Sequence, residues 1–223
     1  MALKRDVISA VLGILVLTLL CGILYPLVIT GVSQVAFPGN ANGQQVSVHG
    51  RLVGSELIGQ NFADPVFKHG KPVLDKNGGV GGVRVMPDPR YFQTRPSGTT
   101  PADNAAASAF ANYGPNSTVT EQAIAANIQS YIQLNGRYYP GGLTAAKVPV
   151  DAADTSASGI DPDISVANAH IQAYRIAAIR HLPISEADRL IATYTGGRGL
   201  GFSGEPAVNV LELNLALNRF SGR

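Results

Sequence analysis

The sequence predicts a single N-terminal transmembrane helix followed by an extracytoplasmic α+β domain with a small sheet and about four helices. Three observations lead to this prediction. A long apolar run without charges lies near the N-terminus, short β-branched segments broken by glycines follow it, and the C-terminal half places apolar residues at helical spacing. The sum of these elements is an α+β domain behind a membrane anchor, and no internal repeat is visible.

The membrane anchor is predicted from residues 7–29, which contain no charged side chain. None of Asp, Glu, Lys or Arg occurs between Asp6 and Arg51. At about 1.5 Å per residue this run reaches about 34 Å, which is enough to cross the hydrocarbon core. A cleaved signal is disfavoured because signal cores are about 7–15 residues long and no small-x-small cleavage site follows. Pro26 is expected to be tolerated because little helix remains beyond it.

The orientation of the anchor follows from the charges that flank it. Lys4 and Arg5 precede the apolar run, and about twenty neutral residues follow it. The positive-inside rule therefore predicts residues 1–6 to be cytoplasmic, residues 30–45 to be a linker, and residues 46–223 to form an extracytoplasmic domain.

Composition limits what this domain can be. The only cysteine, Cys21, lies inside the anchor, so the domain has no disulfide and must be held by its own core. The formal net charge of the chain is +2, and the basic tail contributes part of it. A domain close to neutral is not typical of proteins that bind nucleic acid.

The first part of the domain is predicted to be strands and loops. Residues 46–62 alternate in polarity and are interrupted by glycines, which indicates a strand pair. Residues 63–101 are rich in Gly and Pro and should be mostly loop with short strands.

The remainder is predicted to be mainly helical. Thr120 can cap a helix through Leu134, and Ser165 can cap a helix over residues 166–180. Ser185 begins a short third helix. Residues 206–217 are ambiguous, because their leucines alternate as in a strand while Pro206 suits the first turn of a helix. We favour the helix.

A search for chemistry finds no catalytic residue and no metal site. His49, His69, His170 and His181 are scattered and are expected to be exposed. No Gly-x-Ser-x-Gly motif occurs, and the glycines at 78–82 are not followed by Gly-Lys-Ser/Thr, so they predict a turn and not a phosphate loop. Asp161 and Asp163 flank Pro162 and are explained by a turn before the helix at Ser165.

Several polar, turn-rich segments look specific in shape, namely residues 57–62, 91–97, 112–117, 157–165 and 204–211. Arg95 beside Tyr91 and Phe92 suits either an internal clamp or an interface anchor, because a planar guanidinium stacks on aromatic rings in both settings.

These segments lie in one order behind one anchor, and their most specific motifs are YFQTRPS at residues 91–97, SGIDPDIS at 158–165 and GEPAVNVLELNLAL at 204–217, with the helix pattern Gln172-x-x-Arg175 between the last two. Together they resemble the C subunit of the Kdp potassium-transporting P-type ATPase over nearly the whole chain. The resemblance implies an accessory, non-catalytic subunit of a high-affinity potassium uptake complex in the cell inner membrane. Its partners would be a channel-like potassium-binding subunit, a P-type ATP-hydrolysing subunit and a small single-helix subunit. Six residues in the shared segments are candidates for contacts with these partners: Tyr91, Phe92, Arg95, Asp161, Glu205 and Asn209.

The resemblance also bears on whether this chain contacts ATP. Such subunits are described as catalytic chaperones that raise the ATP affinity of the pump subunit in a transient complex, so ATP is expected only there and no cofactor is expected to bind tightly. The resemblance makes Gln172 and Arg175, which share one helix face, the nucleotide-binding candidates. The alternative is that both residues hydrogen-bond nearby loops such as residues 157–164.

The predicted topology places this helix across the bilayer from cytoplasmic ATP. We therefore expect docking over the outer potassium entrance, with any effect on nucleotide transmitted over a long range. The alternative functions are a membrane-anchored periplasmic enzyme, or a binding module unrelated to transport.

Overall fold

The fold is described from a computed structural model, which describes residues 2–74, 83–99, 102–104, 112–114 and 116–221. The chain divides into two compact units, Met1–Val53 and Gly54–Arg223. The glycine stretch at residues 78–82 lies outside the described residues.

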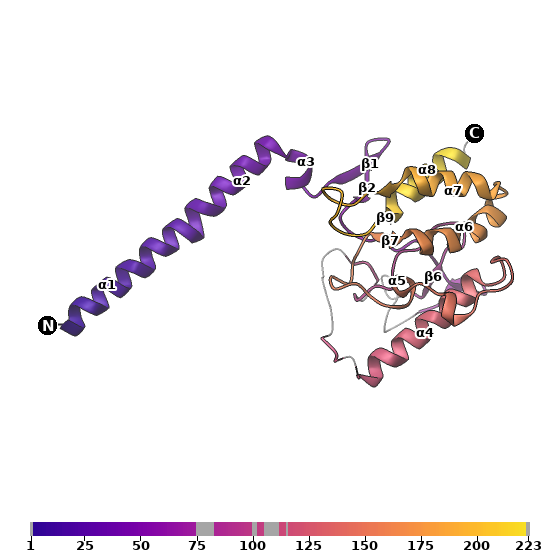
Figure 1. Cartoon of the computed structure of the whole chain (residues 1–223), viewed down its shortest axis with the longest axis horizontal. Coiled ribbons are helices and arrows are strands. Elements are labelled where there is room, and N and C mark those ends of the chain that lie inside the picture. The colour runs from indigo at the N-terminus through magenta and orange to yellow at the C-terminus, as the bar shows by residue number, and fades with distance from the viewer. Residues whose placement is uncertain (1, 75–82, 100–101, 105–111, 115, 222–223) are drawn as a thin grey trace. The chain divides into compact units, whose positions relative to one another are not determined.

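The N-terminal unit is dominated by one long helix, drawn in indigo and purple in Figure 1. Three successive segments build it: α1 (Ala2–Leu17), the π-helical η1 (Thr18–Leu24) and α2 (Tyr25–Ala36). Within the described part of the chain this is the one helix, Leu3–Ala36, long and apolar enough to cross a membrane. A short α3 (Pro38–Ala41) and the two-stranded sheet of β1 (Gln45–Val48) and β2 (Arg51–Ser55) follow.

The prediction that little helix remains beyond Pro26 is wrong, because α2 continues to Ala36. Proline lacks an N–H and its ring clashes with the carbonyl four residues earlier. Here the turn before Pro26 is π-helical, and the Tyr25 N–H bonds to the carbonyl of Leu20, five residues back. This wider turn, and not the end of the helix, accommodates the proline.

The described residues of the second unit form three small antiparallel sheets. The sheets are β3 (Ala63–Pro65) with β6 (Val85–Pro87), β4 (Phe67–Lys68) with β5 (Lys71–Pro72), and the order β7-β9-β8 (Asp163–Ser165, Ala207–Asn209 and Thr195–Gly196).

The helices of this unit confirm the predicted fold class. The four longer ones in the described residues are α4 (Thr118–Asn135), α6 (Val166–Arg180), α7 (Ile184–Thr193) and α8 (Val210–Ser221), with the short η2 (Ala145–Lys147) and α5 (Val150–Ala153) between α4 and β7. Two predicted helix caps are wrong, by three residues for α4 and by two for α7. Helix α4 begins after Ser117 and not at Thr120, and α7 begins after Pro183, so Ser185 lies inside its first turn.

The core of the domain lies where α6, α7 and α8 pack against the β7-β9-β8 sheet (Figure 1). Strands β7 and β9 pair side by side, and each leads directly into a helix. At each junction the last strand residue caps the helix: Ser165 Oγ accepts from the N–H of Asn168 at 3.1 Å, and Asn209 Oδ1 accepts from that of Glu212 at 3.2 Å. The ambiguous residues 206–217 are therefore a short strand followed by a helix.

Candidate functional site

The two residues predicted to face a ligand, Gln172 and Arg175, lie together on α6 and are buried. Their exposed fractions are 1% and 0%. The Nη2 of Arg175 donates to Oε1 of Gln172 at 2.9 Å. A spacing of three residues places both side chains on the same helix face, as predicted, and this face is turned into the domain.

The side-chain amide of Gln172 binds both backbone groups of Gln93, the N–H and the C=O. Its Oε1 accepts from the Gln93 N–H at 2.7 Å, and its Nε2 donates to the Gln93 carbonyl at 3.0 Å and to Asn168 Oδ1 at 2.9 Å. The amide therefore hydrogen-bonds to Gln93, a residue of the YFQTRPS segment, in the way that the backbone of a neighbouring β-strand would. The predicted alternative, hydrogen bonding to a loop, describes this geometry, but the loop is at residues 89–93 and not at 157–164.

Arg175 fastens the same loop through its guanidinium. Nε donates to Asn135 Oδ1 at 2.9 Å, and Nη1 donates to the carbonyl of Tyr91 at 2.9 Å and to that of Pro89. Burial lowers the pKa of Arg175 to about 10, which leaves it cationic at neutral pH. A buried cation surrounded by carbonyl oxygens acts here as a rigid cross-link between α4, α6 and the loop.

Asn214 is a functional residue that the sequence reasoning missed. It lies on α8, 1% exposed, and its amide binds the Phe92 backbone N–H and C=O, both at 2.9 Å. Phe92 and Gln93 are thus held by an amide from each side, Asn214 and Gln172. The available signal was an asparagine inside an otherwise leucine-rich run, which is typical of a buried polar residue with a defined partner.

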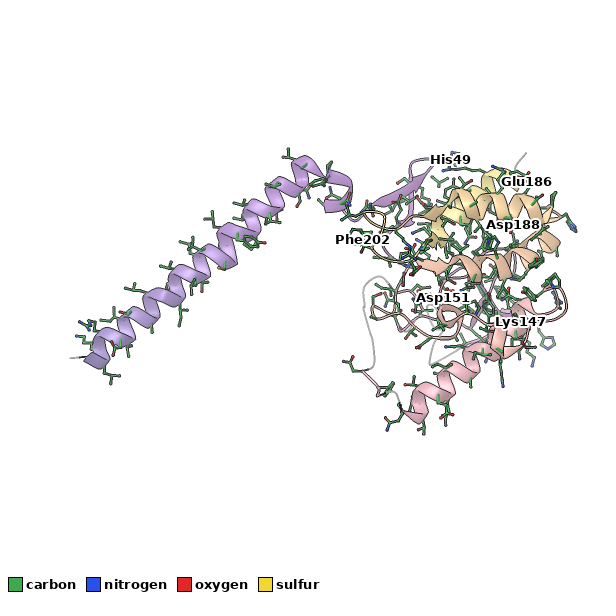
Figure 2. The ribbon with its side chains drawn as sticks, in the orientation of Figure 1. His49, Lys147, Asp151, Glu186, Asp188 and Phe202 are labelled. Atoms are coloured by element: carbon green, nitrogen blue, oxygen red, sulfur yellow. The ribbon has the colours of Figure 1, made fainter. Side chains whose placement is uncertain are left out.

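A second missed group supports the start of α6. Asp151, labelled in Figure 2, accepts from the backbone N–H and hydroxyl of Ser165, both at 2.8 Å, and from Asn168 Nδ2 at 2.9 Å. The Tyr131 hydroxyl donates to Asn168 Oδ1 at 2.7 Å. Burial, reinforced by the charge of Asp151, raises the pKa of Tyr131, so this tyrosine stays protonated.

Three of the interface candidates lie on the YFQTRPS segment and have different surroundings. Phe92 is fully buried in the core, so its side chain presents no surface to a partner in this conformation. Tyr91 is half-buried, and the guanidinium of Arg180 lies 4.8 Å above its ring centre. Arg95 is also half-buried and forms an ion pair with Asp161 at 3.3 Å while donating to the carbonyl of Thr155 at 3.1 Å.

The SGIDPDIS segment packs against the same region of the domain. The Ser97 hydroxyl donates to the Gly159 carbonyl at 2.9 Å, and the Gly59 N–H donates to the Ile160 carbonyl at 2.8 Å. Gly59 is required by this close approach, since a Cβ there would lie 2.8 Å from the carbonyl oxygen of Asp161. The segments around residues 59, 91–97 and 158–165 therefore form one continuous surface.

The last two candidates lie on β9 and the loop before it. Asn209 caps α8 and its Nδ2 donates to the carbonyl of Glu56 at 2.8 Å. Glu205 is exposed and forms an ion pair with Arg198 at 2.6 Å. Of the six candidates, Glu205 is the one with a largely exposed side chain.

The titratable residues show no arrangement for metal chemistry in the described part of the domain. No group of three or more His, Cys, Asp or Glu there could hold a metal ion. All four histidines are exposed, as predicted. The polar side chains that the sequence singled out instead satisfy backbone groups of neighbouring loops, which fixes the shape of those loops.

Fold and site together define a class: a protein with an N-terminal helix long and apolar enough to cross a membrane, whose α+β domain is held together internally by buried amides and a buried arginine. Comparison with known proteins identifies the family. A family model described as KdpC, the c chain of K+-transporting ATPases, matches residues 7–219. The chain belongs to this family.

Relatives from several bacteria extend the match over nearly the whole chain. The Methylococcus capsulatus (strain Bath) protein named potassium-transporting ATPase KdpC subunit is 43% identical over 210 residues, which cover 94% of this chain and 95% of the relative. The KdpC subunit of Methylobacterium nodulans is 44% identical, with 96% of both chains covered. That of Mycobacterium tuberculosis is 39% identical and is covered completely, over 97% of this chain.

Proposed function

We propose that this chain is an accessory, non-catalytic subunit of a potassium-transporting ATPase complex, and that its α+β domain docks on the outer face of the membrane-embedded partners. The observation that carries this proposal is how the polar residues that the sequence singled out, Gln172 and Arg175, are used. Gln172 and Arg175 are buried and bind loop backbone. A site for chemistry needs polar groups free to meet a substrate, whereas a docking domain needs loops of fixed shape.

The outer location rests on charge. Lys4 and Arg5 precede the membrane helix, and Arg51 is the first charged residue after it. Positive charge is retained in the cytoplasm, which supports an extracytoplasmic domain attached to the inner membrane. The partners are then a channel-like potassium-binding subunit, the P-type subunit that hydrolyses ATP, and a small single-helix subunit.

The proposal gives nucleotide no direct contact with this chain. In this conformation the hydrogen-bonding atoms of Gln172 are engaged by Gln93, Asn168 and Arg175, so a nucleotide would have to break those bonds. A chaperone effect on the ATP affinity of the pump subunit would then be a long-range coupling, carried by the docked domain and the anchor.

Two experiments test these statements separately. A tagged full-length chain purified in mild detergent should bring with it a P-type ATPase and a polytopic channel-like protein in fixed stoichiometry. Recovery of the chain alone would argue against the complex. In the assembled complex a photoreactive ATP analogue should label the pump subunit and leave this chain unlabelled. Saturable labelling of this chain, displaced by ATP, would show that it contacts nucleotide.

A further inference from the structure

The loop between β8 and β9 is an arm that stands away from the domain. We use "the arm" for residues 197–206, all of which are exposed. Leu200 and Phe202 lie at its tip, with 91% and 76% of their surfaces exposed. Figure 2 labels Phe202. Two large apolar side chains this exposed within three residues of one loop form a candidate interaction site.

The arm is held in shape by its own hydrogen bonds. Gly199 and Ser203 exchange two backbone bonds of 2.7 and 2.8 Å, and the Phe202 N–H donates to the Gly199 carbonyl at 3.2 Å. At the base, Arg198 donates to the Gly204 carbonyl at 2.9 Å and to the Glu205 carboxylate at 2.6 Å. The tip is therefore presented in one conformation before any partner is met, which lowers the entropic cost of binding.

The turn at the tip of the arm does not have the residues that are usual in a turn of this conformation. Leu200 and Gly201 both have positive φ, 53° and 82°. Asn-Gly is the favoured pair in such a turn, because a branched apolar residue is strained at positive φ. Leu200 adopts this strained conformation although almost none of its surface is buried within the chain. Because no contact within the chain compensates for the strain at Leu200, the reason for a leucine at this position is expected to lie in a contact outside the domain.

We propose that the arm inserts Leu200 and Phe202 into an apolar recess on the outer surface of a membrane-embedded partner subunit. This inference rests on the proposed function and names the element that docks. Glu205, the exposed interface candidate on the sequence, then belongs to the polar rim around the apolar tip. An apolar anchor in a pocket, surrounded by polar groups that exclude water, is the usual form of a binding hot spot.

A protein recess is favoured over a lipid surface for two reasons. Arg198 is the only basic residue in the arm and is paired with Glu205, whereas segments that bind anionic lipid headgroups carry clusters of unpaired Lys and Arg. A bilayer also accepts apolar groups in many orientations, so it does not require a strained turn that fixes one orientation. A shaped recess on a protein admits the side chains in one orientation and does require such a turn.

The test compares the full chain with an arm variant, each co-expressed with the partner subunits. Leu200→Asn supplies the residue that the turn prefers, and Phe202→Ser removes the second apolar group, so the domain should stay folded. Leu74→Asn with Phe67→Ser is the matched control, because these side chains are also exposed, at 75% and 62%. Release of the partner subunits from the immobilised chain is followed over time in detergent.

The arm variant should release its partners about tenfold faster or more, as expected for the loss of a hot spot, and the control should release them at the wild-type rate. If the wild-type chain holds no partners, the proposed function fails and this inference falls with it. If the wild-type chain holds them and the arm variant releases them no faster, or the control is equally impaired, the arm inference fails while the proposed function stands.

A benzoylphenylalanine at position 200 of the full chain identifies what the tip touches without relying on a loss of binding. After irradiation of membranes containing the complex, the adduct should join this chain to a membrane-embedded partner subunit. An adduct with lipid, or with a second copy of this chain, would overturn the proposal.

Discussion

Arg175→Met is the substitution that most directly tests the role of the buried network. Methionine fills a similar elongated space but supplies no donor. Arg175 donates to four acceptors, on Asn135, Tyr91, Pro89 and Gln172. Of these, the Gln172 oxygen keeps its bond from the Gln93 N–H, and the Tyr91 carbonyl keeps one from Gln93 Nε2 at 3.2 Å. The substitution therefore leaves two acceptors without this donor, the fully buried Asn135 oxygen and the carbonyl of the exposed Pro89.

The size of the effect follows from two opposing contributions. An unsatisfied buried acceptor costs about 1–3 kcal/mol, so the two acceptors cost at most about 2–6 kcal/mol. Removing the cation recovers part of this, because burial that lowers the pKa of Arg175 from 12.5 to about 10 corresponds to about 3 kcal/mol against the charged form. We expect a net loss of about 1–4 kcal/mol in the free energy of unfolding, which is a substantial part of the stability of an ordinary domain.

Thermal unfolding of the full-length chain in detergent, followed by far-ultraviolet circular dichroism, measures this loss. For a domain of this size the expected fall in Tm is about 3–12 °C. Arg180→Met is the matched control, since Arg180 lies on the same helix and donates to the Arg90 carbonyl of the same loop, but is only half-buried. It should cost about 1 kcal/mol. Equal effects of the two substitutions, or a wild-type Tm for Arg175→Met, would refute the reasoning.

Three further predictions concern topology, the anchor and pH. Protease added to spheroplasts should digest the domain, and full protection would show that the orientation is opposite to the one proposed. Exchanging residues 7–29 for an unrelated apolar helix should weaken co-purification with the partners, because Gly13 and Gly22 allow close approach of a neighbouring helix; an unchanged yield would exclude this. Burial and the nearby charge of Glu56 raise the pKa of Glu212, so the folded state binds this proton more tightly and stability falls as pH rises above about 4.5. Glu212→Gln should flatten that fall and stabilise the chain by less than about 1 kcal/mol at pH 7; urea unfolding at pH 4–8 that shows the wild-type slope would contradict it.

A local signal predicted the bounds of one helix to the residue, whereas the caps expected at Thr120 and Ser185 were wrong. Ser165 and the apolar spacing after it gave α6 its observed bounds, 166–180, because a capping side chain fixes the first turn. The C-terminal run was harder. Its alternating leucines and its first-turn proline pointed to different elements, and the chain forms both, with Asn209 as the last strand residue and the cap of α8.

The candidate site could not be predicted to the same depth, because its partners are distant in sequence. Gln172 binds a residue 79 positions away, and Asn214 binds one 122 positions away. Periodicity gives the face of a helix but not the loop that covers it. That Gln172 and Arg175 share a face was therefore predictable from spacing alone. The loop that meets them is visible only in the folded domain.

The buried network also explains how a domain without disulfides presents a fixed surface. The backbone of residues 92 and 93 is held from both sides by Asn214 and Gln172, and Arg175 holds the carbonyls just before them. Buried polar groups contribute little net stability when they are satisfied, but they disfavour every alternative packing in which they are not. For the proposed docking role, this selection of a single loop conformation is the useful property. A rigid surface binds without first being ordered, and the cost of ordering it has already been met in folding.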